Sequence, residues 1–152
     1  MKDKEKLMLI AIEEAKKAFE IGEVPVGAIV VKDGVIIGKG HNKRESKQNP
    51  VLHAEIVAIM EASKKLKSWR LEGCEIYVTL EPCPMCAGAL ILSRIKKVYF
   101  GARDPKKGAI VSKLNLLEVK FNHSVEWEGG ILEEECGELL RRFFKILREE
   151  DR

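Results

Sequence analysis

The chain has 152 residues, of which 45% are apolar and 34% charged, and 27 lysines and arginines against 24 aspartates and glutamates give a net charge of +3. This length suits one compact domain over residues 1–152 and is too short for two ordinary domains. No run of 18 apolar residues and no cleavable apolar leader is visible, and two of the four cysteines stand alone, so we expect a cytoplasmic protein rather than a membrane or disulfide-rich secreted one.

Hydrophobic patterning predicts a helix and then a hairpin in the first third of the chain. Apolar residues recur at helical spacing over residues 4–20, and Gly22 is suited to end this helix. Segments 24–31 and 35–37 are rich in β-branched residues, and the Asp-Gly step within 32–34 favours a tight turn between them. Two antiparallel strands are therefore expected.

The rest of the chain alternates between helices and strands. After a polar stretch at 41–50 we expect a helix at 53–66, a strand at 75–80, a helix at 84–93, a strand at 97–100, a basic loop at 101–108, an edge strand at 125–127 and a helix at 132–148. Two strands that flank one helix favour parallel pairing. We therefore predict an α/β fold, a three-layer α/β/α sandwich around a mixed five-stranded sheet, with its site at the carboxyl ends of the parallel strands.

Two short motifs place metal-ligating side chains at the predicted starts of two helices. They are His-Ala-Glu at 53–55 and Pro-Cys-Pro-Met-Cys at 82–86. Zinc prefers tetrahedral nitrogen and sulfur ligands, and three protein ligands leave the fourth position to a water molecule. Cysteines three residues apart in a first helical turn lie on one face and can bind one ion. The sequence therefore predicts a zinc site formed by His53, Cys83 and Cys86.

Glu55 is expected beside the metal and not on it. Because His53 and Glu55 are two residues apart, they do not share a helical face, and the ion should lie beyond the helix end. Two helix amino termini that converge there would favour thiolates through their partial positive charge. The combination of His-x-Glu with Pro-Cys-x-x-Cys is a known signature of zinc nucleobase deaminases. We therefore expect hydrolytic deamination, with Glu55 as the proton carrier.

Other interpretations of the cysteine pair stay open. A Cys-x-x-Cys can be a redox pair or half of a structural zinc site. A closed structural site would need a fourth ligand, for which the candidates are Cys74, Cys136, His41 and His123. Glu55 and Pro82 favour the catalytic interpretation, since neither other site requires them. Cys74 and Cys136 are expected to be small buried apolar residues.

Several blocks outside the zinc motifs carry a family pattern. They are Gly-Glu-Val-Pro-Val-Gly-Ala at 22–28, His-Asn at 41–42, Ser-Trp-Arg-Leu-Glu-Gly-Cys at 68–74, the long block from Tyr77 to Ala89, Ser-Arg-Ile at 93–95, Gly-Ala-Arg-Asp at 101–104 and Phe-Asn-His at 121–123. On these blocks the chain resembles the bacterial tRNA-specific adenosine deaminases of the TadA type, within the cytidine deaminase-like superfamily. The resemblance covers nearly the whole length.

This resemblance implies hydrolysis of adenosine to inosine at the wobble position of a tRNA anticodon. It implies a homodimer with one zinc ion per subunit, no organic cofactor and no membrane contact. A zinc-activated water would attack C6 of the flipped-out adenine, with Glu55 as general base and then general acid.

The resemblance also assigns substrate contacts. Asn42 would hydrogen-bond the nucleoside, Val24 and Leu80 would enclose the base, and the backbone around Ala54 and Pro82 would orient the exocyclic amine. The neighbouring nucleotides would be held by Asp104, Lys106, Asn122 and His123, and Phe144 and Arg148 would add stacking and charge. Alternatively, Phe144 is a core residue and the lysines belong to an ordinary solvated loop.

Three positions depart from the family pattern. Val51-Leu52 stands where Thr-Ala is typical, Val111 where Gly is typical and Ser124 where Arg is typical. Leu52 could narrow the pocket, and the missing arginine could remove a phosphate contact.

Three rival functions share part of the pattern. The nearest is a deaminase of a free base or nucleoside such as guanine or cytosine. The deaminase of riboflavin synthesis is usually joined to a reductase, for which the chain has no room. A zinc-stabilised RNA-binding module would need no Glu55 and would prefer a fourth protein ligand.

Overall fold

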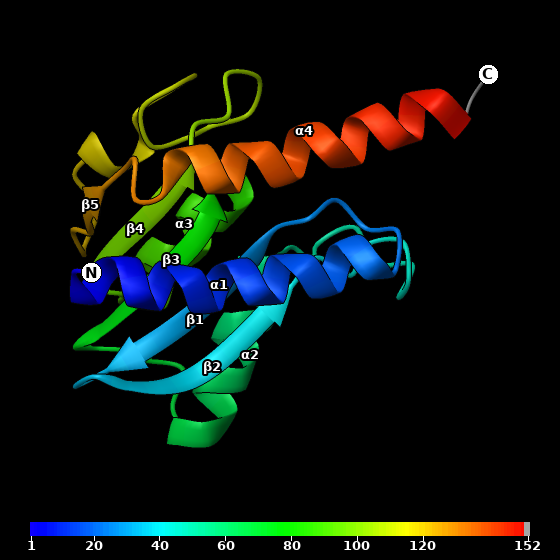
Figure 1. Ribbon diagram of the computed structural model, residues 1–152. Helices are drawn as coiled ribbons and strands as arrows, with labels where there is room; N and C mark the ends of the chain where they lie inside the picture. Colours follow the sequence, from blue (N-terminus) through cyan, green and yellow to red (C-terminus); the bar gives the residue numbers. More distant parts are fainter. Residues whose placement is uncertain (151–152) are drawn as a thin grey trace.

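A five-stranded sheet runs through the molecule in the order β2-β1-β3-β4-β5 (Figure 1). The computed structural model describes residues 1–150. Its strands are β1 (Gly27–Lys32), β2 (Val35–His41), β3 (Cys74–Leu80), β4 (Lys97–Ala102) and β5 (Glu126–Glu128). Its helices are α1 (Asp3–Glu20), α2 (Ala54–Leu66), α3 (Pro84–Leu92), α4 (Glu133–Glu150) and a short 3-10 helix, η1 (Leu116–Glu118). Within this described part, no helix has both the length and the apolar character needed to cross a membrane.

The sheet is mixed, as predicted. β1 is antiparallel to both β2 and β3, whereas β4 is parallel to β3 and to β5. The α3 helix connects β3 to β4, which confirms the parallel pairing expected for two strands on either side of one helix. The carboxyl ends of β3 and β4 therefore lie side by side, and the segments that follow them begin at the same edge of the sheet.

Helices cover both faces of the sheet, with α1 and α4 on one face and α2 and α3 on the other (Figure 1). Alternate residues of β1 serve the two cores. Val30 packs in the cluster that contains Ala58 of α2, whereas Ile29 and Val31 pack in the cluster that contains Met8 of α1. The predicted three-layer α/β/α sandwich is thus confirmed.

The predicted strand boundaries were wrong where proline or glycine stands. β1 begins at Gly27 rather than at residue 24, because Pro25 has no N–H to give to a strand ladder. β2 continues to His41 instead of ending at residue 37. Its Gly38 and Gly40 weaken the strand pattern in the sequence, yet α2 requires them, since a Cβ on either would lie less than 3 Å from the α2 backbone.

Smaller differences occur at other element ends. β4 runs two residues past its predicted end at 100, β5 is shifted by one residue, and η1 was not predicted. The predicted strand ended before Gly101 because glycine is a weak strand former. Glycine is required at this position of β4, since a Cβ there would clash with Cys136 of α4. These shifts leave the order and type of the predicted elements unchanged.

Candidate active site

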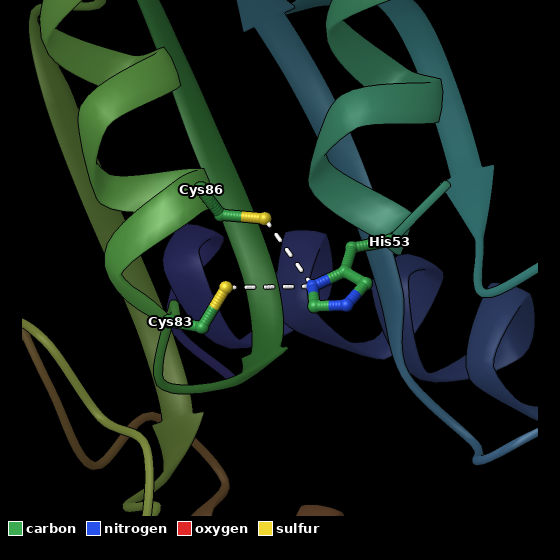
Figure 2. A group of neighbouring side chains, drawn as sticks. All are labelled: His53, Cys83 and Cys86. Carbon is green, nitrogen blue, oxygen red and sulfur yellow. Dashed lines mark hydrogen bonds between the residues drawn. The ribbon is translucent and has the colours of Figure 1, made fainter. Parts of the chain in front are cut away.

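The side chains of both motifs meet at the amino termini of α2 and α3. His53 is the residue just before α2, and Cys83 is the residue just before α3. Cys86 lies in the first turn of α3, whose first residue, Pro84, has the fixed φ angle that suits a helix start. Figure 2 shows the imidazole of His53 and the two sulfurs pointing toward one another from these two helix ends.

The distances between the donor atoms suit a zinc ion. His53 Nδ1 lies 3.5 Å from the Sγ atoms of both Cys83 and Cys86, and the three donor atoms all lie within 4.8 Å of one another. Zinc bonds of about 2.0–2.3 Å at tetrahedral angles place donor atoms roughly 3.3–3.8 Å apart. The three residues therefore fit one tetrahedral ion and leave a position for a small molecule.

In its described part, the structure offers no fourth protein ligand for a closed structural zinc site. Among the described residues, no other histidine, cysteine, aspartate or glutamate joins the group of three. Cys74 and Cys136 are buried as free thiols, as expected of small apolar residues. Neither they nor His41 and His123 complete a four-ligand site, so the geometry favours an open, catalytic arrangement.

The local electrostatics favour a thiolate at Cys83. Hydrogen bonds from the Cys86 thiol and from His53 lower the pKa of Cys83 to about 4, against the opposing effect of burial. The amino terminus of α3 adds partial positive charge at the same point. A thiolate is the form in which cysteine binds a metal.

Glu55 lies in the first turn of α2 with its side chain buried and 4% exposed. Burial raises the pKa of Glu55 to about 7, and a hydrogen bond from the backbone and the nearby charge of His53 offset part of this rise. A carboxyl group with a pKa near neutrality can both accept and release a proton at neutral pH. Glu55 thus has the character of an acid–base group next to the three donors.

An open cavity of about 1030 Å³ leads to this group and contains both Glu55 and Cys83 in its wall. Its basic lining residues are Arg44, Arg103, Lys106, Lys107, Arg141, Lys145 and Arg148. Its acidic lining residues are Glu55, Glu81 and Asp104. The net charge of the whole chain is small, but this cavity concentrates positive charge, which attracts polyanions.

Comparison with known proteins shows to which family the chain belongs. The sequence model of the MafB19-like deaminases matches residues 2–148. The chain belongs to this deaminase family. A curated relative from Bacillus subtilis (strain 168), named tRNA-specific adenosine deaminase, is 56% identical over 149 residues, which are 97% of this chain and 92% of the relative. The resemblance found in the sequence is thereby confirmed.

Solved structures agree with this placement. One, from a study of A-to-I editing by tRNA:A34 deaminases at the wobble position of transfer RNA, is 40% identical with a TM-score of 0.86, over 89% of this chain and 99% of that chain. Another, a guanine deaminase from Nitrosomonas europaea, has a TM-score of 0.81 over 91% of this chain and 83% of that chain. At 24% identity, this second structure shares the fold alone with the present deaminase.

Most of the substrate residues predicted from the sequence line the cavity of this deaminase: Val24, Asn42, Ala54, Leu80, Asp104, Lys106, Phe144 and Arg148. Asn42 is buried, and its amide is fixed because Nδ2 donates to the Val24 carbonyl and Oδ1 accepts from the Arg44 N–H. Phe144 is 41% exposed and borders the cavity, so it is not a core residue.

Three predicted residues, Pro82, Asn122 and His123, do not line the cavity. His123 Nε2 lies 2.7 Å from the carbonyl oxygen of Ile95, which ties the ring to the body of the domain. Leu52, whose bulk could have narrowed the pocket, also does not line it. RNA contacts by Asn122 and His123 remain a prediction.

Two buried carboxylates that hydrogen-bond to loops next to the cavity had no predicted role. Glu23, only 2% exposed, accepts hydrogen bonds from the backbone N–H groups of Glu45 and Ser46 and so fixes the loop after Asn42. Glu81, also 2% exposed, accepts from the loop after β4. In the sequence, each of these residues was visible only as a charged residue at the edge of an apolar segment. If such a residue is buried, its carboxylate must accept hydrogen bonds from nearby donors.

Glu23→Gln should lower the free energy of unfolding at pH 7 by about 2 kcal/mol, because the amide replaces one of two charged acceptor oxygens with a donor. Burial would raise the pKa of Glu23, but the hydrogen bonds from Ser46 and Glu45 outweigh it and hold the pKa below its ordinary value of 4.5. The carboxylate therefore contributes fully above pH 4.5 and loses its contribution as the pH falls through the lower, folded-state pKa. Urea unfolding of both proteins at pH 7 and pH 3 should show a smaller difference at pH 3; an equal difference would contradict this account.

Proposed function

We propose that this deaminase converts adenosine to inosine at the wobble position of a tRNA anticodon. One observation carries the proposal: a zinc-type His/Cys/Cys group and the buried Glu55 lie at a cavity whose charged lining residues are mainly basic. The first feature supplies hydrolytic deamination, and the second attracts a nucleic acid rather than a free base.

The residues of the site define the chemistry. A zinc ion held by His53, Cys83 and Cys86 would lower the pKa of a water molecule toward neutrality. Glu55 would accept a proton from the attacking water and would deliver protons to the purine ring and to the departing amine. A C–O bond forms at C6, the exocyclic C–N bond breaks, and the products are inosine and ammonia.

The cavity wall accounts for recognition of the base. Val24 and Leu80 present apolar surface on two separate segments of the wall, and the Asn42 amide, which also lines the cavity, is held by its hydrogen bond to the Val24 carbonyl. Such a pocket suits a base that has been flipped out of a stack. The backbone of Ala54, which lines the cavity, and that of Pro82, which lies behind the lining between Glu81 and Cys83, would orient the exocyclic amine beside Glu55.

The outer part of the cavity holds the neighbouring nucleotides. Phe144 offers a half-exposed ring on which a base can stack, and Lys106 and Arg148 supply charge for phosphates. Asp104 lines the same part of the cavity, whereas the contacts that the resemblance assigns to Asn122 and His123 would be made outside the cavity. The cavity volume of about 1030 Å³ lies at the upper end of the roughly 300–1,000 Å³ typical of ligand pockets and leaves room for more than one free base.

The relatives support the same substrate. The Bacillus subtilis relative is named for a tRNA-specific adenosine deaminase, whereas the likeness to the guanine deaminase concerns the fold alone. We also propose, from the resemblance noted in the sequence, that the protein is a cytoplasmic homodimer whose subunits are single domains over residues 1–152, each holding one zinc ion.

A panel of substrates tests this function. The zinc-loaded protein should form inosine in an anticodon stem-loop with adenosine at the wobble position, and should leave free adenosine, guanine and cytosine essentially unchanged. Ammonia release from a free base, with an unchanged stem-loop, would move the function to the free-base alternative. Retained zinc and RNA binding without ammonia release from any substrate would favour an RNA-binding module.

A further inference from the structure

We propose that Glu81 is a positioning residue that organises the RNA-binding loop 103–112 and so sets the affinity for RNA. The inference rests on the proposed function and names a determinant of substrate binding within it. Glu81 follows directly after β3, two residues before Cys83, and is buried to 2% exposure. The hydrogen bonds of its carboxylate go to the loop that follows β4.

The carboxylate of Glu81 accepts hydrogen bonds along the length of this loop. Its Oε1 accepts from the Asp104 N–H at 3.1 Å and from the Ser112 hydroxyl. Its Oε2 accepts from three consecutive N–H groups, at 3.1 Å from Ile110, 2.8 Å from Val111 and 2.9 Å from Ser112. Both ends of the loop are thus attached to one buried side chain.

The loop between these ends carries the substrate-facing side chains. Asp104 Oδ1 accepts from the backbone N–H groups of Lys106 and Lys107, and the Gly108 N–H donates to the Asp104 carbonyl. These bonds form a tight turn, and they leave the Lys106 and Lys107 side chains at the cavity. Because Glu81 holds the Asp104 N–H, the position of the whole turn depends on the carboxylate.

A carboxylate is needed because every partner is a donor. Glutamine at position 81 would keep one acceptor oxygen, but its NH₂ group would face N–H or O–H donors. About half of the hydrogen bonds to the loop would therefore be lost. Gly108 also lies against this carboxylate, and a Cβ at Gly108 would overlap the Glu81 carboxyl group. Gly108→Ala therefore disturbs the same contact from the loop side without removing the charge.

This geometry predicts a separation of binding from chemistry. In Glu81→Gln the loop should shift while the metal-binding residues, which are fixed by α2 and α3, stay in place. We expect KM for the anticodon stem-loop to rise about tenfold or more, and kcat at saturating RNA to stay within about threefold of wild type. The zinc content should remain one per chain.

The test measures kcat, KM and zinc content for wild type, Glu81→Gln, Gly108→Ala and a control, Glu14→Gln. Glu14 is also buried, at 5% exposure, but it contacts Lys17 and His41 and does not line the cavity. Both loop variants should raise KM, and Glu14→Gln should not. If Glu81→Gln does not fold, Gly108→Ala decides, since it too should raise KM while kcat and zinc content stay near those of wild type.

The outcomes separate this inference from the function on which it rests. An active wild type with unchanged KM in the folded loop variants would overturn the role of Glu81 and leave the proposed function intact. A loss of zinc or kcat with unchanged KM would also overturn it, because Glu81 would then act on the metal site. A wild type that forms no inosine in the stem-loop would refute the proposed function and this inference with it.

Discussion

Glu55→Gln should lower kcat/KM for the stem-loop by about 10⁴-fold, at the upper end of the effect of a single acid–base group. The reason is that one carboxyl group serves both the proton removal and the proton deliveries, and glutamine can do neither. Glutamine has nearly the same shape, so the buried position next to Cys86 stays filled. Single-turnover assays of inosine formation, with zinc content and RNA affinity measured on the same samples, check the prediction.

A neighbouring glutamate on the same helix provides the control. Glu61 lies on α2 like Glu55, but its side chain is exposed. Glu61→Gln should therefore have wild-type activity. Deamination retained by Glu55→Gln at more than one tenth of the wild-type rate would show that another group moves the protons.

Cys86→Ser should reduce zinc affinity by more than about 100-fold, since even loss of a residue that only supports a ligand costs 10–100-fold. Serine keeps the size of the buried side chain but is a poor zinc ligand, because zinc sites use thiolate sulfur. Activity should fall in parallel. Metal analysis after dialysis against a weak chelator measures the loss, and added zinc should raise the melting temperature of wild type but not of the variant.

Cys74→Ser is the matched control for this substitution. Cys74 and Cys86 are both 0% exposed, but only Cys86 belongs to the group of three donors. Cys74→Ser should therefore bind one zinc ion and gain thermal stability from it as wild type does. Equal zinc loss in both variants would mean that general destabilisation, not loss of a ligand, explains the effect.

The metal-binding group could be predicted from sequence because its determinants are local. The three ligands lie at helix starts, and the spacing of Cys83 and Cys86 within one turn fixes their relative position. Only the approach of His53 to this turn needs tertiary structure, and it follows once β3 and its neighbours form one sheet. The order of helices and strands followed from hydrophobic periodicity for the same reason.

Features that depend on contacts between distant segments could not be predicted. Glu81 binds N–H groups up to 31 residues away, and no local pattern indicates which donors a buried carboxylate will find. The two glycines of β2 resemble a loop in sequence, and only the packing of α2 against them explains the strand. The positive cavity likewise combines residues near Arg44, Arg103 and Arg148, whose proximity is a property of the fold.

The central claim is that this deaminase acts on one adenosine in RNA, and the identity of the nucleoside at that position tests it most directly. Two anticodon stem-loops would be incubated with the zinc-loaded protein, one with adenosine at the wobble position and one with guanosine there and adenosine elsewhere in the loop. Digestion and mass spectrometry of the nucleosides should find inosine only in the first, with one ammonia released per inosine. Inosine at other positions in equal yield, or no inosine in either RNA, would contradict the account.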